Sequence, residues 1–290
     1  MMKKKHVSIF VVSYNHAKFV ELCLNSIKCQ WNVSYDLTVI DNGSIDGTSD
    51  IIRQLNVTQD FKFIENNTNL GLPTTLNMCL DMALGEYICF IAADDYMAIN
   101  RLFVQVRFLE EHHEFYACSG TQLKVDDNNN LCDIKKQKNI IKNFMVIDKG
   151  NIFDKTNIIY SPTSIYRTQA LKDIGGYRTD IAIEDLYIYY KAAERNYKIA
   201  VLPNLFSFYR IHSGNSHSKL KWMHENKLKI LGEFKKAPFY EKLKDLIYLE
   251  GFYSLSSKHK LLALKIIPKI MHRIDSKYLY AGIFKLLFKW

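Results

Sequence analysis

The first hundred residues alternate between two kinds of hydrophobic pattern. Short apolar runs with the length of buried strands occur at residues 7–13, 37–40, 61–64 and 87–93. The segments between them repeat apolar residues at helical spacing, as at Phe19, Cys23 and Ile27. Pro73 fits the first turn of the third such helix, where a proline leaves no hydrogen bond unmade. This alternation predicts an α/β fold with a mostly parallel, doubly wound sheet.

The size and composition of the chain allow one substantial core plus an appendage. The chain has 290 residues, 48% of them hydrophobic and 13% aromatic, so it is not disordered. Its six cysteines form no C-x-x-C motif, and we interpret them as small core residues in a reducing cytoplasm. The lysines before Val7 resemble the start of a signal peptide. Asn15, His16 and Lys18 interrupt the apolar stretch that follows, so we expect a first strand there.

An acidic pair, Asp94-Asp95, directly follows the fourth apolar run. Carboxylates are seldom buried unless they are paired or bind a metal, and open α/β sheets bind ligands at the carboxyl ends of their strands. Mg2+ usually lies between one or two carboxylates and a substrate phosphate. On its own, such a pair more often marks a turn, here before a helix that starts near Ile99.

Polar motifs follow the other strands as well. Ser13-Tyr14-Asn15 follows the first strand, and Asn69-Leu70-Gly71 follows the third. The second strand leads into Asp41-Asn42-Gly43-Ser44. The sequence has neither a G-x-G-x-x-G after the first strand nor a P-loop, which argues against a dinucleotide enzyme or an ATPase. With Asp94-Asp95, these motifs are expected to line one crevice at the strand ends.

In this order and spacing, the motifs resemble those of the inverting family 2 glycosyltransferases with the GT-A fold. The resemblance covers roughly residues 5–215 and rests on segments 12–15, 39–48, 66–71 and 92–95 and on the pair Glu184-Asp185. It implies a GT-A domain at residues 1–217, followed by a basic, mostly helical C-terminal region at residues 218–290. It also implies an enzyme that transfers one sugar from a nucleotide-sugar donor.

The resemblance assigns a set of residues to the donor. Asp41 would accept the imide N–H of a uracil, while Tyr14 packs near the ring. Leaving such an edge unpaired would cost about 1–3 kcal/mol. The Asp41 side chain also suits a turn with the N–H of Gly43 or Ser44, and both roles can coexist. The full predicted set is Ser13, Tyr14, Asn15, Asp41, Asn69, Gly71, Asp94 and Arg210.

The same resemblance predicts a metal site. The D-x-D motif of the family has Ala92 at its first position here, which leaves the expected ribose contact open. Asp94 takes the metal-binding position with Asp95 beside it. Arg210 can fork onto a phosphate, and His212 can bind a metal or a phosphate. We therefore expect Mn2+ or Mg2+ at Asp94, Asp95 and His212, where it would stabilise the leaving nucleoside diphosphate.

Glu184 and Asp185 open a probable helix with Tyr189 on its buried side. The helix dipole favours acidic residues in a first turn, so capping alone explains the pair. Within the resemblance, Asp185 is the general base, a role typically worth about 10²- to 10⁴-fold in rate. Glu184 would orient the acceptor or Asp185. The attack is a single displacement, so the anomeric configuration inverts.

The positive charge is concentrated in the C-terminal region. Residues 219–290 contain 16 Lys and Arg and 6 Asp and Glu, whereas the whole chain has a net charge of +9. Basic residues recur every four positions from 265 to 277, which predicts a basic amphipathic helix broken near Pro268. Its predicted apolar face comprises Ile267, Ile270, Met271, Ile274 and Tyr278.

Three roles fit this region: a helix whose apolar side covers the catalytic domain, attachment to an anionic membrane surface, or nucleic-acid binding. The mixture of aromatic residues and lysines at 283–290 favours a membrane over nucleic acid. No run of 18 apolar residues occurs there.

The sequence thus predicts a metal-dependent, inverting transferase that moves one sugar from a UDP-sugar to a hydroxyl of a glycan or lipid-linked glycan. Lipopolysaccharide or capsule synthesis is expected from family analogy alone. Transfer to a polyprenyl phosphate and sugar-nucleotide binding without turnover stay open, although Asp94, Asp185 and His212 argue against the latter. We expect a cytoplasmic protein, peripheral on the inner face of the cytoplasmic membrane, with no nucleic-acid partner.

Overall fold

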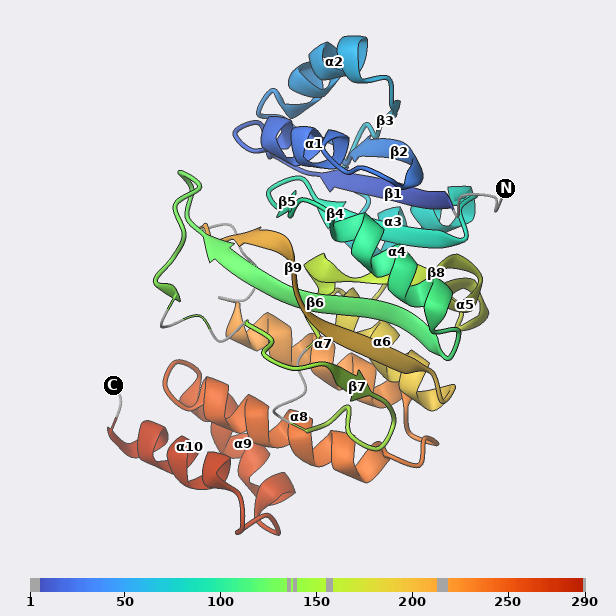
Figure 1. The fold of residues 1–290 in the computed structure, drawn as a ribbon. Helices are drawn as coiled ribbons and strands as arrows, with labels where there is room; N and C mark the ends of the chain where they lie inside the picture. Colours follow the sequence, from blue (N-terminus) through green and yellow to red (C-terminus); the bar gives the residue numbers. More distant parts are fainter. Residues whose placement is uncertain (1–5, 135–136, 138–139, 155–158, 213–218, 289–290) are drawn as a thin grey trace. The chain divides into compact units, whose positions relative to one another are not determined.

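The computed structural model of the chain describes residues 6–134, 137, 140–154, 159–212 and 219–288 (Figure 1). These residues form two compact units, one within 6–212 and one within 219–288, and each is described by itself. The predicted boundary between residues 217 and 218 lies outside the described residues.

The first unit is built on a sheet of nine strands in the described part of the chain. Its parallel side consists of β1 (His6–Ser13), β2 (Ser34–Asp41), β3 (Lys62–Glu65) and β4 (Tyr87–Ala92). In the parallel register Ser13 lies opposite Asp41, and Val12 lies opposite Ala92. The carboxyl ends of β1, β2 and β4 therefore meet at one edge of the sheet, just before Asp94 (Figure 1).

The other side of the sheet is mixed. The strand order is β3-β2-β1-β4-β8-β6-β9-β5, with β7 also paired to β9. The two long strands, β6 (Phe115–Val125) and β9 (Lys198–Arg210), pair in parallel. Each antiparallel pair among the named strands contains one short strand: β5 (Tyr96–Met97), β7 (Met145–Ile147) or β8 (Ile165–Arg167). The predicted mostly parallel α/β sheet is confirmed.

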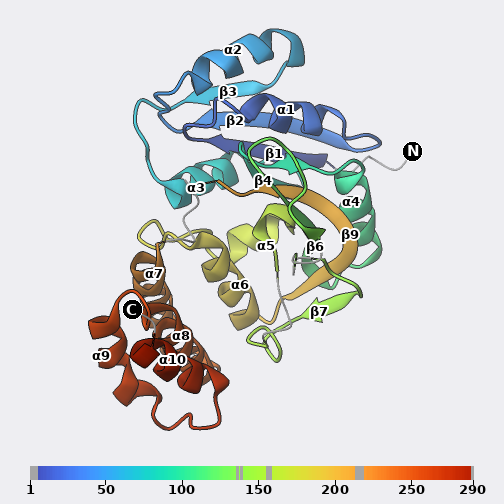
Figure 2. The same cartoon turned by 90° about the vertical axis from the view of Figure 1, so that its left-hand side faces the viewer.

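Helices cover both faces of this sheet (Figures 1 and 2). One face packs against α1 (Val20–Lys28), α2 (Thr48–Gln59) and α4 (Arg101–Glu111), which share the main hydrophobic core with alternate residues of β1 and β4. The intervening residues point to the other face, where Phe10 stacks on Phe90. The remaining helices of the unit are α3 (Leu72–Met82), α5 (Thr168–Asp173) and α6 (Glu184–Glu194), with a 3-10 turn at Ser161–Thr163.

The second unit consists of four described helices: α7 (Leu220–Glu233), α8 (Tyr240–Leu255), α9 (Lys260–Ile270) and α10 (Lys277–Phe288). Helix α8 packs against the other three. Glycines allow this close approach, because a Cβ at Gly251 would lie 2.3 Å from the His224 ring and one at Gly282 would lie 2.4 Å from Phe252. None of the described helices is long and apolar enough to cross a membrane.

The amphipathic pattern predicted through residues 265–278, with a break near Pro268, extends over two helices, and Pro268 itself lies inside the first of them. Helix α9 ends at Ile270, and turns at 271–276 separate it from α10. Both helices pack against α8, so the chain must reverse between them. The predicted apolar face is accordingly divided: Ile270 is buried in the core of the unit, whereas Met271 and Ile274 are exposed.

Candidate active site

Asp94 lies at the edge of the sheet between two histidines. Its Oδ2 is 2.9 Å from Nε2 of His212, which follows β9, and 3.8 Å from Nε2 of His16, which precedes α1. Its Oδ1 is buried and has no hydrogen-bond partner among the described residues. Three segments that are distant in sequence therefore meet at one carboxylate.

The surroundings of Asp94 keep it ionised. Burial alone would raise its pKa, but the hydrogen bond from His212 and the charges of the two histidines bring the pKa below its ordinary value. The same hydrogen bond raises the pKa of His212, whereas burial lowers the pKa of His16. The arrangement is a charged carboxylate with one oxygen held by an imidazole and one oxygen free for a cation.

His16 is a site residue that the sequence reasoning missed. Its ring packs edge-on to that of His212, with 6.5 Å between centroids, and its buried Nδ1 has no partner in the described part of the chain. The backbone N–H of His16 donates to Thr48 Oγ1 at 2.9 Å, which fixes the start of α1 against α2. The available signal was its position directly after Ser13-Tyr14-Asn15.

Asp95 differs from its neighbour in both direction and charge. Its Oδ1 accepts the backbone N–H of Arg210 at 2.8 Å, and the residue is 2% exposed. Burial, followed by the charge of Asp94, raises the pKa of Asp95 well above its ordinary value. The hydrogen bond from Arg210 ties the end of β4 to β9, and the metal-ligand role of Asp95 stays a prediction.

Arg210 joins three segments of the chain near Asp94 through hydrogen bonds. Its guanidinium donates from Nε to the carbonyl of Asp94 at 2.8 Å, from Nη1 to the carbonyl of Asp126 at 2.7 Å and from Nη2 to Asn129 Oδ1 at 2.6 Å. It also lies 4.3 Å from the centroid of the Phe19 ring. Arg210 is 1% exposed, and these bonds support a role in positioning Asp94, while its contact with a phosphate stays a prediction. The N–H groups of its guanidinium already donate hydrogen bonds to the loop that contains Asp94 and to the loop that contains Asp126 and Asn129.

The loops after β1 and β2 are joined to each other. The backbone N–H of Asn15 donates to Ser44 Oγ at 2.8 Å, and Asn15 Oδ1 accepts the N–H of Ile45 at 2.9 Å. Asn15 adopts a left-handed backbone with φ of 57°, which asparagine tolerates better than most residues. The Tyr14 ring remains 43% exposed beside this junction. The predicted aromatic contact with a base is therefore compatible with the structure.

Asp41 forms the turn that the sequence left as one of its two roles. It is fully buried, and its carboxylate accepts the Ser44 N–H at 2.9 Å, the Ser44 hydroxyl at 2.5 Å and the Ser49 hydroxyl at 2.8 Å. These bonds fix the loop after β2. The Ser13 hydroxyl is buried at the end of β1, opposite Asp41 in the strand register, and it has no hydrogen-bond partner among the described residues.

The loop after β3 is hydrogen bonded to the loop after β2. Asn42 Nδ2 donates to Asn69 Oδ1 at 3.0 Å, and Asn69 Oδ1 also accepts the N–H of Gly71 at 2.8 Å. Gly43 is required between them, because it has a φ of +81° and its added Cβ would lie 2.7 Å from the carbonyl carbon of Thr68. The two loops thus form one rigid surface at the edge of the sheet.

Glu184 and Asp185 occupy the first turn of α6. Burial and the charge of Asp185 raise the pKa of Glu184 to about 8, so Glu184 is mostly protonated near pH 7. Asp185 Oδ1 accepts the N–H of Leu186 at 2.7 Å. The pair therefore contains a neutral carboxyl and, in Asp185, the better candidate for a base.

Tyrosines surround this acidic pair and connect it to β4. Tyr177 packs edge-on against Phe90 at 5.9 Å, and Phe90 lies four residues before Asp94 on the same segment. The backbone N–H and carbonyl of Tyr177 bond to the amide of Asn77 in α3 at 2.8 and 2.7 Å. Charges on Glu184 and Asp185 contribute to the raised pKa values of Tyr177 and Tyr189 after burial itself. Tyr177 thus lies between the strand that leads to Asp94 and the segment that contains Glu184.

The residues around Asp94 fit a divalent cation in part. The described residues contain no ready-made cluster of three or more His, Cys, Asp or Glu side chains with metal-binding geometry. Mg2+ and related cations commonly take only one or two protein ligands when substrate phosphates and water supply the others. Asp94, with its buried and unpartnered oxygen, and His212 suit this arrangement. Asp95 does not.

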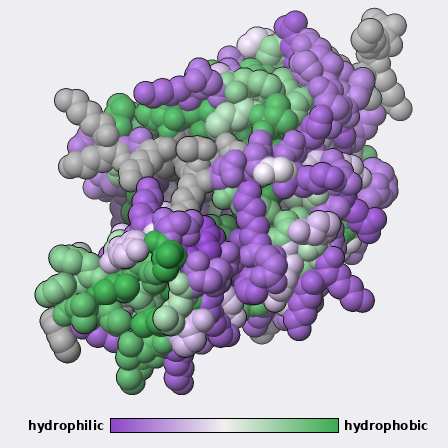
Figure 3. All heavy atoms as spheres, turned by 90° about the horizontal axis from the view of Figure 1, so that it is seen from below, coloured by the Kyte–Doolittle hydropathy of each residue, from purple (hydrophilic) through white to green (hydrophobic). Residues whose placement is uncertain are grey.

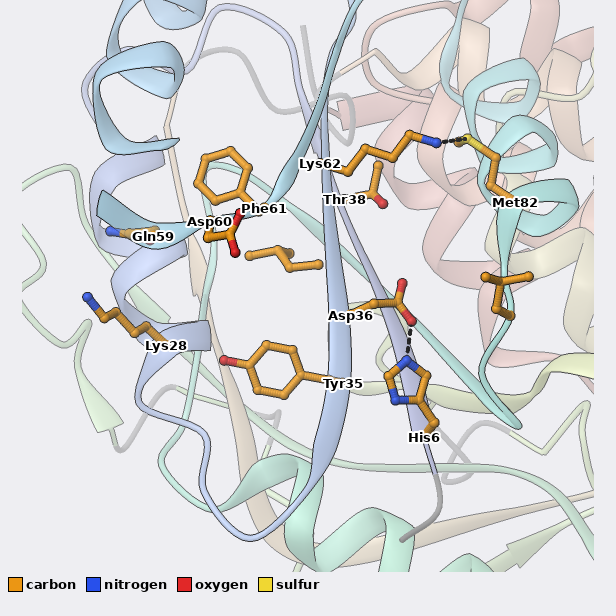
Figure 4. Close-up of a pocket in the computed structure, with 12 residues that line it drawn as sticks. His6, Lys28, Tyr35, Asp36, Thr38, Gln59, Asp60, Phe61, Lys62 and Met82 are labelled. Atoms are coloured by element: carbon orange, nitrogen blue, oxygen red, sulfur yellow. Dashed lines mark hydrogen bonds and ion pairs between the residues drawn. The ribbon is translucent and has the colours of Figure 1, made fainter. Parts of the chain in front are cut away.

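A separate cavity lies at the opposite ends of the strands. It has a volume of about 550 Å³ and is lined by the beginnings of β1 and β2, including His6 and Asp36, which are hydrogen bonded to each other (Figure 4). It contains none of the predicted site residues. The carboxyl ends of the strands, where Ser13 and Asp41 lie, are therefore the better candidate site.

The motifs of this edge match a known family along most of the first unit. A family model described as glycosyl transferase family 2 matches residues 8–175. The chain belongs to this family. The predicted resemblance is confirmed, and the match includes Asp41 and Asp94.

Among curated members of glycosyl transferase family 2, a poly-beta-1,6-N-acetyl-D-glucosamine synthase of Staphylococcus epidermidis is 23% identical over 218 residues, covering 70% of this chain. The alignment spans only 50% of that relative, so the chain matches about half the length of this curated relative.

Solved structures of the family share the fold. The structure of Staphylococcus aureus TarS residues 1–349 in complex with UDP has a TM-score of 0.71 at 21% identity, covering 97% of this chain and 88% of that one. A mannosyltransferase from Pyrobaculum calidifontis, in complex with GDP-Man and Mn2+, has a TM-score of 0.66 at 18% identity, covering 99% and 88%. At these identities the likeness shows the fold alone, and it confirms the predicted GT-A architecture.

Proposed function

We propose that this family 2 glycosyltransferase is a metal-dependent, inverting enzyme that moves one sugar from a UDP-sugar to a hydroxyl of a glycan. The observation that carries the proposal is the ionised Asp94 at the end of β4, with one oxygen bonded to His212 and the other buried and unpartnered among the described residues. An open α/β sheet binds its ligand at this edge.

The donor would lie over the loops that follow β1 and β2. The exposed Tyr14 ring supplies a stacking surface for the base, worth about 0.5–1.5 kcal/mol beyond its buried area. Asp41 fixes the loop through Ser44 and Ser49, and its contact with the imide edge of uracil remains part of the proposal. The TarS complex with UDP supports UDP as the nucleotide.

Asp94 and His212 would hold Mn2+ or Mg2+ together with the diphosphate. When bound, the cation neutralises negative charge on the leaving nucleoside diphosphate. His16 sits 3.8 Å from the same carboxylate and limits the directions that Asp94 can take. Asp95 and Arg210 keep the end of β4 in place through β9. The mannosyltransferase complex with Mn2+ supports a divalent cation in this fold.

At the other end of the site, Asp185 would take the proton of the attacking hydroxyl. Glu184, protonated near neutral pH, is suited to donate a hydrogen bond to the acceptor rather than to remove a proton. One displacement at the anomeric carbon inverts its configuration. The reaction needs an ionised carboxylate at Asp94 to bind the cation and a base at Asp185 to accept a proton. The two carboxyl pairs therefore have separate tasks.

The acceptor is proposed to be a glycan or lipid-linked glycan in the assembly of a lipopolysaccharide or capsule, on the cytoplasmic face of the membrane. The polysaccharide synthase among the relatives supports a polymer or its precursor as the acceptor class. The buried, unpaired state of Cys23, Cys79, Cys89 and Cys118 is consistent with a reducing compartment.

A donor screen tests this function. The full chain would be incubated with UDP- and GDP-sugars and Mn2+, and release of the nucleoside diphosphate would be measured with and without EDTA. We expect one UDP-sugar to be turned over and EDTA to stop its turnover. Tight UDP binding with no turnover of any donor, in the presence of a mixed glycan acceptor pool, would instead indicate a binding protein.

A further inference from the structure

The second unit carries an exposed hydrophobic surface formed by α9 and α10. Large apolar side chains on these helices are between 48% and 80% exposed, and Figure 3 shows hydrophobic residues gathered at its lower left, over the C-terminal helices. We call the following residues the α9–α10 surface: Leu261, Leu264, Tyr280, Phe284, Leu287 and Phe288.

These side chains lie on helix faces other than those that form the hydrophobic core of the unit. Along α9, Leu261 and Leu264 lie on the side opposite Ala263 and Ile266, which are buried against α8 with Ile270. Along α10, residues 280, 284, 287 and 288 repeat at helical spacing, whereas Leu279 and Gly282 face inward. Each helix has already buried one apolar side, so the α9–α10 surface is a second one.

The charge around this surface is strongly positive. Residues 258–288 contain seven Lys and Arg but a single acidic residue, Asp275. Asp275 is itself bonded to Arg273 at 3.0 Å. Lys265 and Lys277 are exposed, one on each side of the turn between the helices. An apolar surface bordered by lysines suits a phase that is apolar inside and anionic at its boundary.

We propose that the α9–α10 surface docks the protein on an anionic lipid bilayer. The leucines and phenylalanines would enter the boundary between headgroups and acyl chains, and Lys265 and Lys277 would remain at the level of the lipid phosphates. Docking of this kind requires no membrane span. It holds a transferase beside a lipid-linked acceptor, but the inference rests on the surface itself and not on the sugar-transfer chemistry.

Vesicle co-sedimentation tests the proposal with the full chain. The probes are vesicles of phosphatidylcholine alone and of phosphatidylcholine with phosphatidylglycerol. We expect binding to the mixed vesicles only, with an affinity that falls as salt is raised.

Two matched pairs of variants separate the apolar and the charged contributions. Lys265→Gln with Lys277→Gln should weaken binding about 30-fold, since each lysine near such a surface contributes a factor of about five. Lys235→Gln with Lys236→Gln removes the same charge from exposed positions outside the surface and should change binding far less. Phe284→Ser with Leu287→Ser should abolish binding, whereas Val57→Ser with Leu84→Ser, two exposed apolar residues of the first unit, should not.

Other outcomes would overturn the proposal. Equal binding to neutral and mixed vesicles, or equal losses in the two lysine pairs, would show that the surface does not recognise anionic lipid. If the chain ignores vesicles, and sedimentation shows a dimer that Phe284→Ser with Leu287→Ser converts to a monomer, then a second copy covers the surface. Donor turnover measured in the same preparations distinguishes either failure from failure of the transferase function.

Discussion

The chain has two adjacent acidic pairs, Asp94-Asp95 and Glu184-Asp185, and the structure treats them differently. In each pair one carboxyl is driven toward the neutral form by burial and by the charge of its neighbour, Asp95 in the first and Glu184 in the second. The other member is placed for chemistry. Asp94 lies between two histidines, whereas Asp185 lies at a helix N-terminus among tyrosines.

This difference teaches how one residue pattern serves two purposes. Two neighbouring carboxyls in a partly dry site cannot both ionise easily, so their pKa values separate. The partners of the remaining carboxylate then decide its role. Imidazoles and an unpartnered oxygen suit a cation and a diphosphate, and a carboxylate in the first turn of a helix, beside a carboxyl with a raised pKa, suits proton transfer. The predictions below remove one member at a time.

The largest effect is expected for Asp94→Ala. Without this carboxylate, the charge on the leaving diphosphate loses its cation ligand, and turnover should fall by about 10³-fold or more. The measurement is the steady-state release of UDP from the active donor. Asp50→Ala, an exposed acid of α2, is the control and should keep normal turnover. Comparable losses of turnover in both variants would contradict the assignment of Asp94 as the cation ligand.

The next largest effect is expected for Asp185→Asn. The amide keeps the shape of the side chain but cannot accept the proton, so turnover should fall by about 10² or more while the affinity for UDP is retained. Glu184→Gln is the matched neighbour, and it should lose far less because Glu184 is already mostly neutral near pH 7. A larger loss in Glu184→Gln than in Asp185→Asn would exchange their roles.

A stability effect is expected for Arg210→Lys. Lysine cannot reproduce the fork that reaches the carbonyls of Asp94 and Asp126 and the amide of Asn129, and unsatisfied buried groups cost about 1–3 kcal/mol each. Urea unfolding should show a loss of about 2 kcal/mol. Arg107→Lys, on the exposed side of α4, should show almost none. An unchanged urea midpoint for Arg210→Lys would mean that the guanidinium hydrogen bonds do not stabilise the segment that contains Asp94.

The smallest effect concerns Glu184→Gln and pH. The folded pKa of Glu184, about 8, lies above its ordinary value of 4.5, so the wild type loses stability as pH rises from about 4.5 to about 8. The variant lacks this loss. We expect it to be more stable than the wild type at pH 8 and equally stable below pH 4.5, as measured by urea unfolding. Glu110→Gln, an exposed control, should follow the wild type throughout.

Much of the fold followed from local pattern. Strand periodicity located β1 to β4, and Pro73 located the first turn of α3, because these features depend on neighbours in sequence. A break near Pro268 was predicted, but the turns that separate α9 from α10 lie at 271–276, and both helices pack against α8. The single apolar face predicted across this break was wrong, because Met271 and Ile274 are exposed whereas Ile270 is buried.

The candidate site was predictable in residue type but not in direction. Asp94 stood out because it ends a buried strand. The sequence could not show that Asp95 points to the backbone of β9 or that the Arg210 fork is used by two loops, since these contacts join residues more than 80 positions apart. For the same reason it did not associate His16 with Asp94 and His212.

Calorimetric titration of UDP, with and without Mn2+, into the wild type, Asp94→Ala and Asp185→Asn tests the division between the two acidic pairs most directly. The wild type and Asp185→Asn should bind UDP more tightly when Mn2+ is present, and Asp94→Ala should show no effect of Mn2+. An equal effect of Mn2+ in all three proteins would contradict the assignment of the cation to Asp94 and, with it, the separate tasks of the two pairs.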